Sequence, residues 1–191
     1  MAESQIYWQT FETDDLSIQL PGTFIGGNPK KDKEKIQRDI LKLPKKYHPG
    51  FSGLLTNTSF PFAAVDGQLD DSFTFFTSLT ASSENLPLLR QKMTLEEYVK
   101  QVQKRLGKNM LVQQHTLIKI GDYSAARLLI ADRKMQGLIK KPAEIQRKVL
   151  MFCLKLPKTF WSFAYSAMPE KFEELIPIFE KSIHSVKIKK K

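Results

Sequence analysis

The chain has 191 residues, of which 41% are hydrophobic and 26% are charged. This length and composition support a packed core and exclude a mostly disordered chain. The single cysteine excludes an internal disulfide, so folding does not require an oxidising compartment. With 30 Lys and Arg residues against 20 Asp and Glu, the formal net charge is +10, which favours partners with acidic or anionic surfaces.

The positive charge is concentrated in a few segments. Residues 28–48 carry eight bases and three acids, and residues 133–148 carry six bases and one acid. We interpret these segments as insertions between the regular secondary-structure elements of the fold. The predicted organisation is a single domain over residues 1–191, with basic inserts at 28–50 and 133–144 and a Lys-rich tail at 187–191.

The N-terminus has neither the basic segment nor the apolar run of a secretory signal. The longest apolar run, Val149–Leu154, has six residues, which is far short of a membrane span. We therefore expect a cytoplasmic protein. A thylakoid-lumen or periplasmic location stays open, because an export signal that has been removed leaves no trace in the mature chain.

The first elements predicted are two short strands. Residues 6–11 are rich in β-prone and aromatic side chains, and residues 16–20 alternate between apolar and polar. The Asp-rich turn between them predicts a hairpin, which Pro21 and Gly22 end. A loop is expected to open at Gly26.

The first basic insert contains a helical pattern. A short helix over residues 31–43 is indicated by three apolar side chains at helical spacing, Ile36, Ile40 and Leu43. Pro44 and the His48-Pro49-Gly50 sequence are expected to stop it. Beyond this insert, we expect strands over residues 54–62 and 72–79.

A capping box marks the next helix, over residues 94–106. Thr94 is a good N-cap residue, and Glu97 lies at the position from which its carboxylate returns to the N-cap amide. The following residues predict a β-hairpin, with strands over 112–120 and 123–131 joined at Gly121-Asp122.

The last third predicts two strands, a helix and a short final strand. Residues 145–156 and 159–167 are apolar on both faces, which is typical of a sheet covered on both sides. A helix begins at Pro169 and should be kinked by Pro177. The complete order predicts an α+β fold, in which a mostly antiparallel sheet carries two amphipathic helices.

Several segments in this order resemble the PsbP-like fold family, which includes the photosystem II extrinsic subunit, a small Ran-GTPase-binding protein and uncharacterised bacterial proteins. The matching segments are Leu16–Phe24, Thr94–Leu106, Gly121–Arg127 and Phe160–Ile183. The resemblance implies an α/β/α sandwich, a mostly antiparallel sheet flanked by helices, that serves as a binding module without catalysis.

The residues themselves indicate no catalytic or metal site. The three histidines are widely separated, and no His, Cys or acidic residues have metal-ligand spacing. Cys153 has apolar neighbours and is interpreted as a buried, inert thiol. The aromatic run Phe160–Tyr165 is interpreted as core, with a base-stacking surface as the alternative. We expect neither an enzyme nor a cofactor.

The candidate partner-binding residues are the basic side chains of the two inserts. Mixed with aliphatic residues, such bases can dock in a partner's groove, lie on anionic lipid or simply surround residues that cover the domain's own core. The candidates are Lys30, Lys31, Lys33, Lys35, Arg38, Lys42, Arg133, Lys134, Lys140 and Lys141.

The expected function is that of a non-catalytic protein-binding module: an assembly factor, a chaperone or an accessory subunit of a larger complex. A role in a photosynthetic complex is the most specific form of this expectation. Its basic loops would steer it to an acidic protein surface. The alternative is an anionic-surface binder. Nucleic acid is the less favoured surface, because Lys outnumbers the base-reading Arg in both inserts, and peripheral membrane contact stays open.

Overall fold

A computed structural model of the protein describes residues 6–68, 76–106, 109–133 and 145–189. The strands of its large sheet are β3 (Phe24–Gly27), β4 (Phe62–Asp66), β5 (Ser78–Asn85), β6 (Met110–Ile120), β7 (Tyr123–Arg133), β8 (Ile145–Lys155) and β9 (Thr159–Ala167). This sheet is antiparallel throughout, in the order β3-β4-β5-β9-β8-β7-β6. A small sheet has the order β1-β2-β10, formed by β1 (Trp8–Glu12), β2 (Leu16–Pro21) and β10 (Lys187–Ile188).

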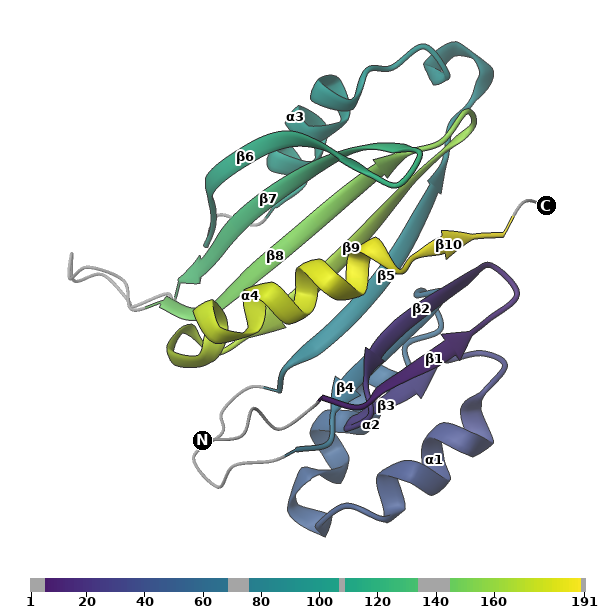
Figure 1. The fold of residues 1–191 in the computed structure, drawn as a ribbon, viewed down its shortest axis with the longest axis vertical. Coiled ribbons are helices and arrows are strands. Elements are labelled where there is room, and N and C mark those ends of the chain that lie inside the picture. Colours follow the sequence, from purple (N-terminus) through teal and green to yellow (C-terminus); the bar gives the residue numbers. More distant parts are fainter. Residues whose placement is uncertain (1–5, 69–75, 107–108, 134–144, 190–191) are drawn as a thin grey trace.

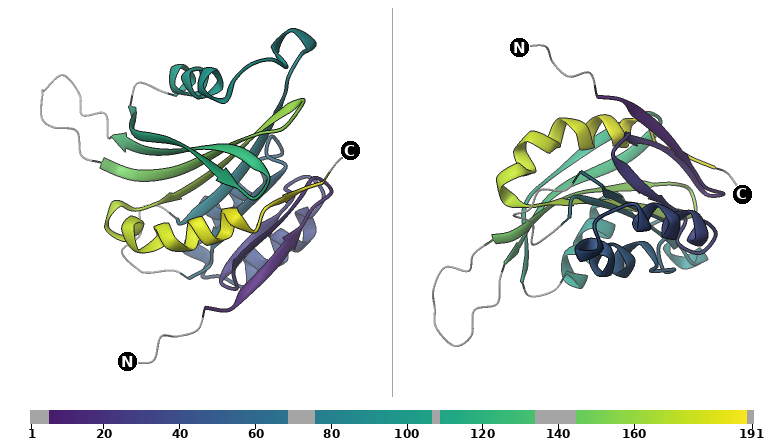
Figure 2. Two further views of the ribbon diagram at one scale, coloured as in Figure 1. Left: turned by 45° about the horizontal axis from the view of Figure 1, so that its top comes forward. Right: turned by 90° about the horizontal axis from the view of Figure 1, so that it is seen from below.

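Helices cover both faces of the large sheet, which confirms the α+β sandwich. The α-helices are α1 (Lys33–Leu41), α2 (His48–Leu55), α3 (Leu95–Arg105) and α4 (Pro169–His184), and the 3-10 turns are η1 (Lys45–Tyr47) and η2 (Leu88–Arg90). Figure 2 shows α3 and α4 on opposite sides of the sheet. The small sheet lies beside α4 (Figure 1), and Ser182 of α4 donates a 2.8 Å hydrogen bond to the Gln19 carbonyl of β2.

The two faces of β8 explain its continuous apolar sequence. Phe152 packs in the core beneath α4, whereas the neighbouring Cys153 packs in the core beneath α3. Both side chains are buried. The prediction of a sheet covered on both sides is therefore confirmed, since alternate residues of one strand enter two different cores.

The first basic insert folds as a helical layer over one end of the large sheet. The chain leaves β3, forms α1, η1 and α2, and returns as β4, which pairs with β3. Ile36 and Ile40 are 1% and 4% exposed, and they pack with Phe51 of α2 and Val65 of β4 in a third core. The aliphatic residues of the insert thus cover the protein's own sheet.

Two predictions for this region are wrong. The strand expected over 54–62 is instead the end of α2 followed by a loop, because Pro49 occupies the first turn of α2, where its missing N–H costs nothing. The loop expected at Gly26 is instead β3. A Cβ at Gly26 would overlap the Ala63 carbonyl, so glycine is needed there for close strand pairing, not for a turn.

Most other elements agree with the sequence. The first hairpin is formed by β1 and β2, and Thr94 and Glu97 form the reciprocal bonds of the capping box. The hairpin expected from the strands over 112–120 and 123–131 is formed by β6 and β7. The helix α4 continues past Pro177. The strand expected over 72–79 falls partly outside the described residues, and β5 begins at Ser78. Among the described residues, no helix is long and apolar enough to cross a membrane.

Candidate partner-binding surface

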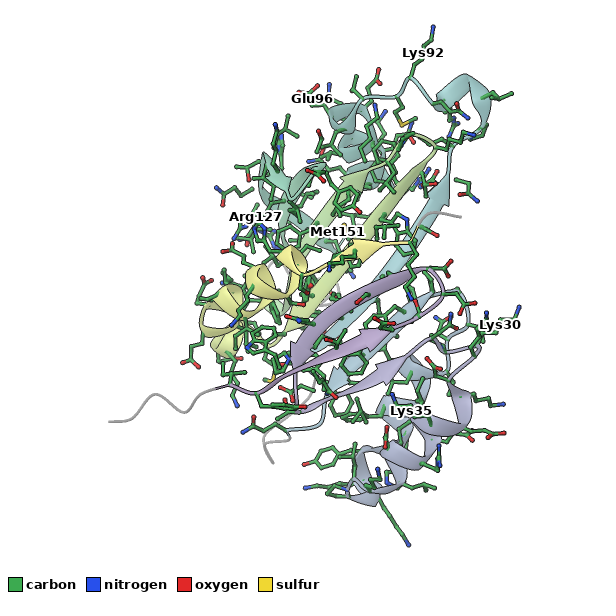
Figure 3. All side chains as sticks on the ribbon, turned by 45° about the vertical axis from the view of Figure 1, so that its right-hand side comes forward. Lys30, Lys35, Lys92, Glu96, Arg127 and Met151 are labelled. Atoms are coloured by element: carbon green, nitrogen blue, oxygen red, sulfur yellow. The ribbon has the colours of Figure 1, made fainter. Side chains whose placement is uncertain are left out.

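Six of the predicted site residues lie on α1, in the loop before it or at its C-cap. They are exposed, and we call them the α1 basic surface: Lys30, Lys31, Lys33, Lys35, Arg38 and Lys42. The burial of Ile36 and Ile40 fixes the rotation of the helix, so that its charged residues face solvent. Figure 3 shows Lys30 and Lys35 on this part of the molecule.

Hydrogen bonds at the start of α1 fix the loop that carries the first lysines. The Asn28 amide oxygen accepts bonds from the backbone N–H groups of Lys30 and Lys31, at 2.9 and 3.2 Å. The Asp32 carboxylate accepts a 2.7 Å bond from the Asn28 N–H. A Cβ at Gly27 would lie 2.5 Å from this carboxylate, so the loop requires glycine there. The loop is therefore built by its own sequence, independently of any partner.

A groove of about 610 Å³ runs between α1 and the edges of β1 and β3. Phe11, Phe24 and Leu43 give it apolar walls. Its charged lining residues are Lys35, Lys42 and Asp39, so the lining carries a formal charge of about +1. The Lys35 ammonium lies 5.8 Å from the centre of the Phe11 ring. Such a groove can accept an extended segment that carries both carboxylates and apolar side chains.

Part of the positive charge on this surface is already neutralised. Lys31 is ion-paired with Asp14, and the Lys42 ammonium lies 2.7 Å from the Asp39 carboxylate. Within the described chain, no ion pair involves Lys30, Lys33 or Arg38. These three cations can therefore meet carboxylates of a partner without first breaking an internal ion pair.

Of the second predicted group, only Arg133 lies in the described part of the chain. Arg133 is exposed at the end of β7, next to the sheet edge opposite β3 and α1. Lys134, Lys140 and Lys141 lie outside the described residues. In the tail, Lys189 lies 3.7 Å from Glu12. Of the predicted site residues that the structure describes, Lys35 and Lys42 line the groove, and Arg133 lies near the opposite edge of the large sheet.

Sequence reasoning missed a second group of bases, which we call the α3 basic cluster: Arg90, Lys92, Lys100 and Lys104. They line a shallow depression of about 480 Å³ at the end of α3, and Figure 3 shows Lys92 there, far from Lys35. The four-residue spacing of Lys100 and Lys104 places them on one helix face and could have revealed the cluster. It differs from the α1 groove because its bases surround few apolar side chains.

Two buried titratable side chains, Cys153 and Tyr165, have polar partners within the core. Burial raises the pKa of the Cys153 thiol to about 11, and its sulfur lies 3.6 Å from the Ser162 hydroxyl. Burial also raises the pKa of Tyr165, whose hydroxyl donates to Ser182 at 3.0 Å. The whole aromatic run belongs to the core. The described part of the chain holds no group of three or more His, Cys, Asp or Glu residues placed to bind a metal.

No family model matches the sequence, and no curated protein matches it either. Solved structures match its fold. A solution structure of cyanobacterial PsbP (CyanoP) from Synechocystis sp. PCC 6803 aligns over 99% of this chain and 98% of its own, with a TM-score of 0.56 and 10% identity. The chain has the PsbP-like fold. LpqN of Mycobacterium tuberculosis, described as involved in cell envelope biogenesis, aligns over 98% of this chain and 93% of its own, with a TM-score of 0.59 and 12% identity.

The PsbP-like fold confirms the architecture expected from the sequence. At 10% and 12% identity, the similarity extends to the fold and not to particular side chains. The α1 basic surface must therefore be judged on its own geometry.

Proposed function

We propose that the protein is a non-catalytic binding module, which holds an acidic segment of a protein partner against the α1 basic surface. The groove beside α1 supports this proposal most strongly, because it combines apolar walls with Lys35 and Lys42. Lys30, Lys33 and Arg38 are further exposed bases on the same helix and the loop before it. An acidic segment with apolar side chains would gain both charge complementarity and burial there.

The packing of α1 weighs against a lipid surface as the main partner. A helix that lies in a membrane interface needs an exposed apolar face. The apolar face of α1 is instead buried against α2 and β4, through Ile36 and Ile40. The helix residue Leu41 is 71% exposed, and a single leucine gives little insertion energy.

An accessory role in a larger assembly fits the fold. The PsbP-like neighbours include CyanoP, and LpqN is described as involved in cell envelope biogenesis. For the present chain we propose an assembly factor, chaperone or accessory subunit, with a photosynthetic complex as one case. The partner's recognisable property is an acidic surface segment.

The test is capture of partners by the tagged protein at about 50 and about 300 mM NaCl, with nuclease and detergent added as controls. One variant replaces Lys31, Lys33, Lys35 and Lys42 by Gln. The matched control replaces the four residues of the α3 basic cluster by Gln and so removes the same charge.

The proposal predicts a protein partner that survives nuclease and detergent, binds less at high salt and is lost only from the first variant. Equal loss from both variants would indicate a response to net charge alone. Loss of all association with nuclease or with detergent would point to nucleic acid or to membrane and would refute the proposal.

A further inference from the structure

The strand β6 forms one edge of the large sheet, and only β7 pairs with it in the described chain. Its outer backbone groups therefore face away from the sheet over 11 residues. Most of its side chains are exposed, including Leu111 and Leu117 at 43% and 52%. A long edge strand with exposed apolar side chains is a template for pairing with another strand.

The helices leave this edge accessible. The main contacts of α3 are with β7 and β8, and those of α4 with the large sheet are with β8 and β9. Figure 1 shows β6 at the margin of the sheet. Its regular pairing with β7 is interrupted at Gln113, where a β-bulge shifts the register, and it ends at the Gly121-Asp122 turn. The regular part of β6 is therefore the segment 114–120.

We propose that this segment pairs antiparallel with the same segment of a second copy of the chain, about a two-fold axis through Leu117. Seven residues lie between the bulge and the turn, and Leu117 is the middle one. It is also the most exposed large aliphatic residue of the strand. A symmetric pair that uses the whole regular segment must place this leucine opposite itself.

The side chains are compatible with this register. Leu117 pairs with Ala126 within the sheet, so it projects on the face covered by α3, and two copies of Leu117 would cover each other there. The segment contains no acidic residue and one lysine. Lys119 would lie opposite His115 of the second copy, so the register brings no two lysines together. Because side chains alternate along a strand, each residue of one copy would lie opposite a residue that projects from the same face of the joined sheet.

The dimer would join two large sheets into one. Its α1 basic surfaces would lie at the outer ends, because α1 lies beyond the opposite edge of the sheet from β6 (Figure 1). If α1 binds acidic segments, as the proposed function states, the dimer is bivalent and can hold two such segments at once. The pairing itself does not depend on that function.

The dependence on salt concentration distinguishes the proposed dimer from the proposed binding of an acidic partner. Each copy carries a formal charge of +10, so two copies repel at low ionic strength and salt should favour the dimer. Binding of an acidic partner should respond in the opposite direction. The paired segment is only about 24 Å long, at the 3.4 Å rise of an antiparallel strand, so we expect a weak dimer.

The decisive test is Leu117→Cys in the full chain, oxidised under mild conditions. Residues paired on a two-fold axis have Cα separations suited to a disulfide. We expect disulfide-linked dimers to form at least about tenfold faster than for Leu111→Cys or for Leu88→Cys, which is strongly exposed on η2. The native Cys153 is buried and should not compete.

Sedimentation equilibrium from about 5 to about 300 µM gives an independent measure. Wild type should dimerise more strongly at about 300 than at about 50 mM NaCl, and Leu117→Lys should weaken the dimer at least about tenfold. The inference is overturned if Leu117→Cys is linked no faster than Leu111→Cys, or if wild type stays monomeric throughout. Either result would leave partner capture by α1 untouched.

Discussion

The docking of α1 on the sheet can be tested by Ile36→Ala. Ile36 is 1% exposed and packs in the core shared by α1, α2 and β4. The substitution removes three buried carbons, worth about 2.4 kcal/mol at about 0.8 kcal/mol each. The cavity left behind raises the expected loss of unfolding free energy to about 3 kcal/mol. For a chain of this length, that lowers the Tm by about 6–12 °C.

The matched control is Leu41→Ala on the same helix. Leu41 is 71% exposed, so its truncation should change the free energy of unfolding by less than about 0.5 kcal/mol. Urea denaturation of both variants, with thermal melts beside it, measures the difference. If Ile36→Ala costs no more than Leu41→Ala, the apolar face of α1 is not held in the core and is available to a membrane after all.

Three further predictions concern a helix cap and two groups buried in the core. Thr94→Ala removes the capping-box acceptor of α3 and should cost about 1 kcal/mol in urea denaturation. Burial raises the pKa of Cys153 to about 11, so its contribution to stability is complete below about pH 8.5 and is lost as the pH rises toward 11. Between pH 8 and pH 10.5, the unfolding free energy of wild type should therefore fall more than that of Cys153→Ala. Ser182→Ala should cost about 1–3 kcal/mol, and more than Tyr165→Phe, because it leaves both the Tyr165 hydroxyl and the Gln19 carbonyl without their buried partner. Equal costs for these two variants would contradict that hydrogen-bond chain.

The elements predicted well are those with a strong local signal. The capping box at Thr94 and Glu97 fixes where α3 begins, and the apolar run from Ile145 fixes β8. The first basic insert was harder to interpret. Proline and glycine commonly end elements, yet Pro49 lies in the first turn of α2 and Gly26 lies inside β3. Whether such residues end or begin an element depends on packing against strands that are distant in sequence.

The candidate site could be predicted only in part from the sequence, because some of its residues are brought together by packing between distant elements. The bases of α1 are visible as a cluster in the sequence, and the helical spacing of Ile36 and Ile40 predicts which face they occupy. The groove was not predictable, because Phe11 and Phe24 reach it from β1 and β3. The α3 basic cluster was missed because Arg90 and Lys92 precede the helix, and only the fold brings them beside Lys100.

The most direct test of α1 as the partner-binding surface is zero-length carbodiimide coupling, which joins a lysine amine to a carboxylate in contact with it. The captured complex would be coupled, digested and mapped by mass spectrometry. We predict that partner Asp and Glu residues are joined mainly to lysines of the α1 basic surface: Lys35 and Lys42, which line the groove, and Lys30, Lys31 and Lys33, which are exposed nearby in the sequence. Coupling concentrated on Lys100 and Lys104, or spread over the exposed lysines in general, would contradict the assignment.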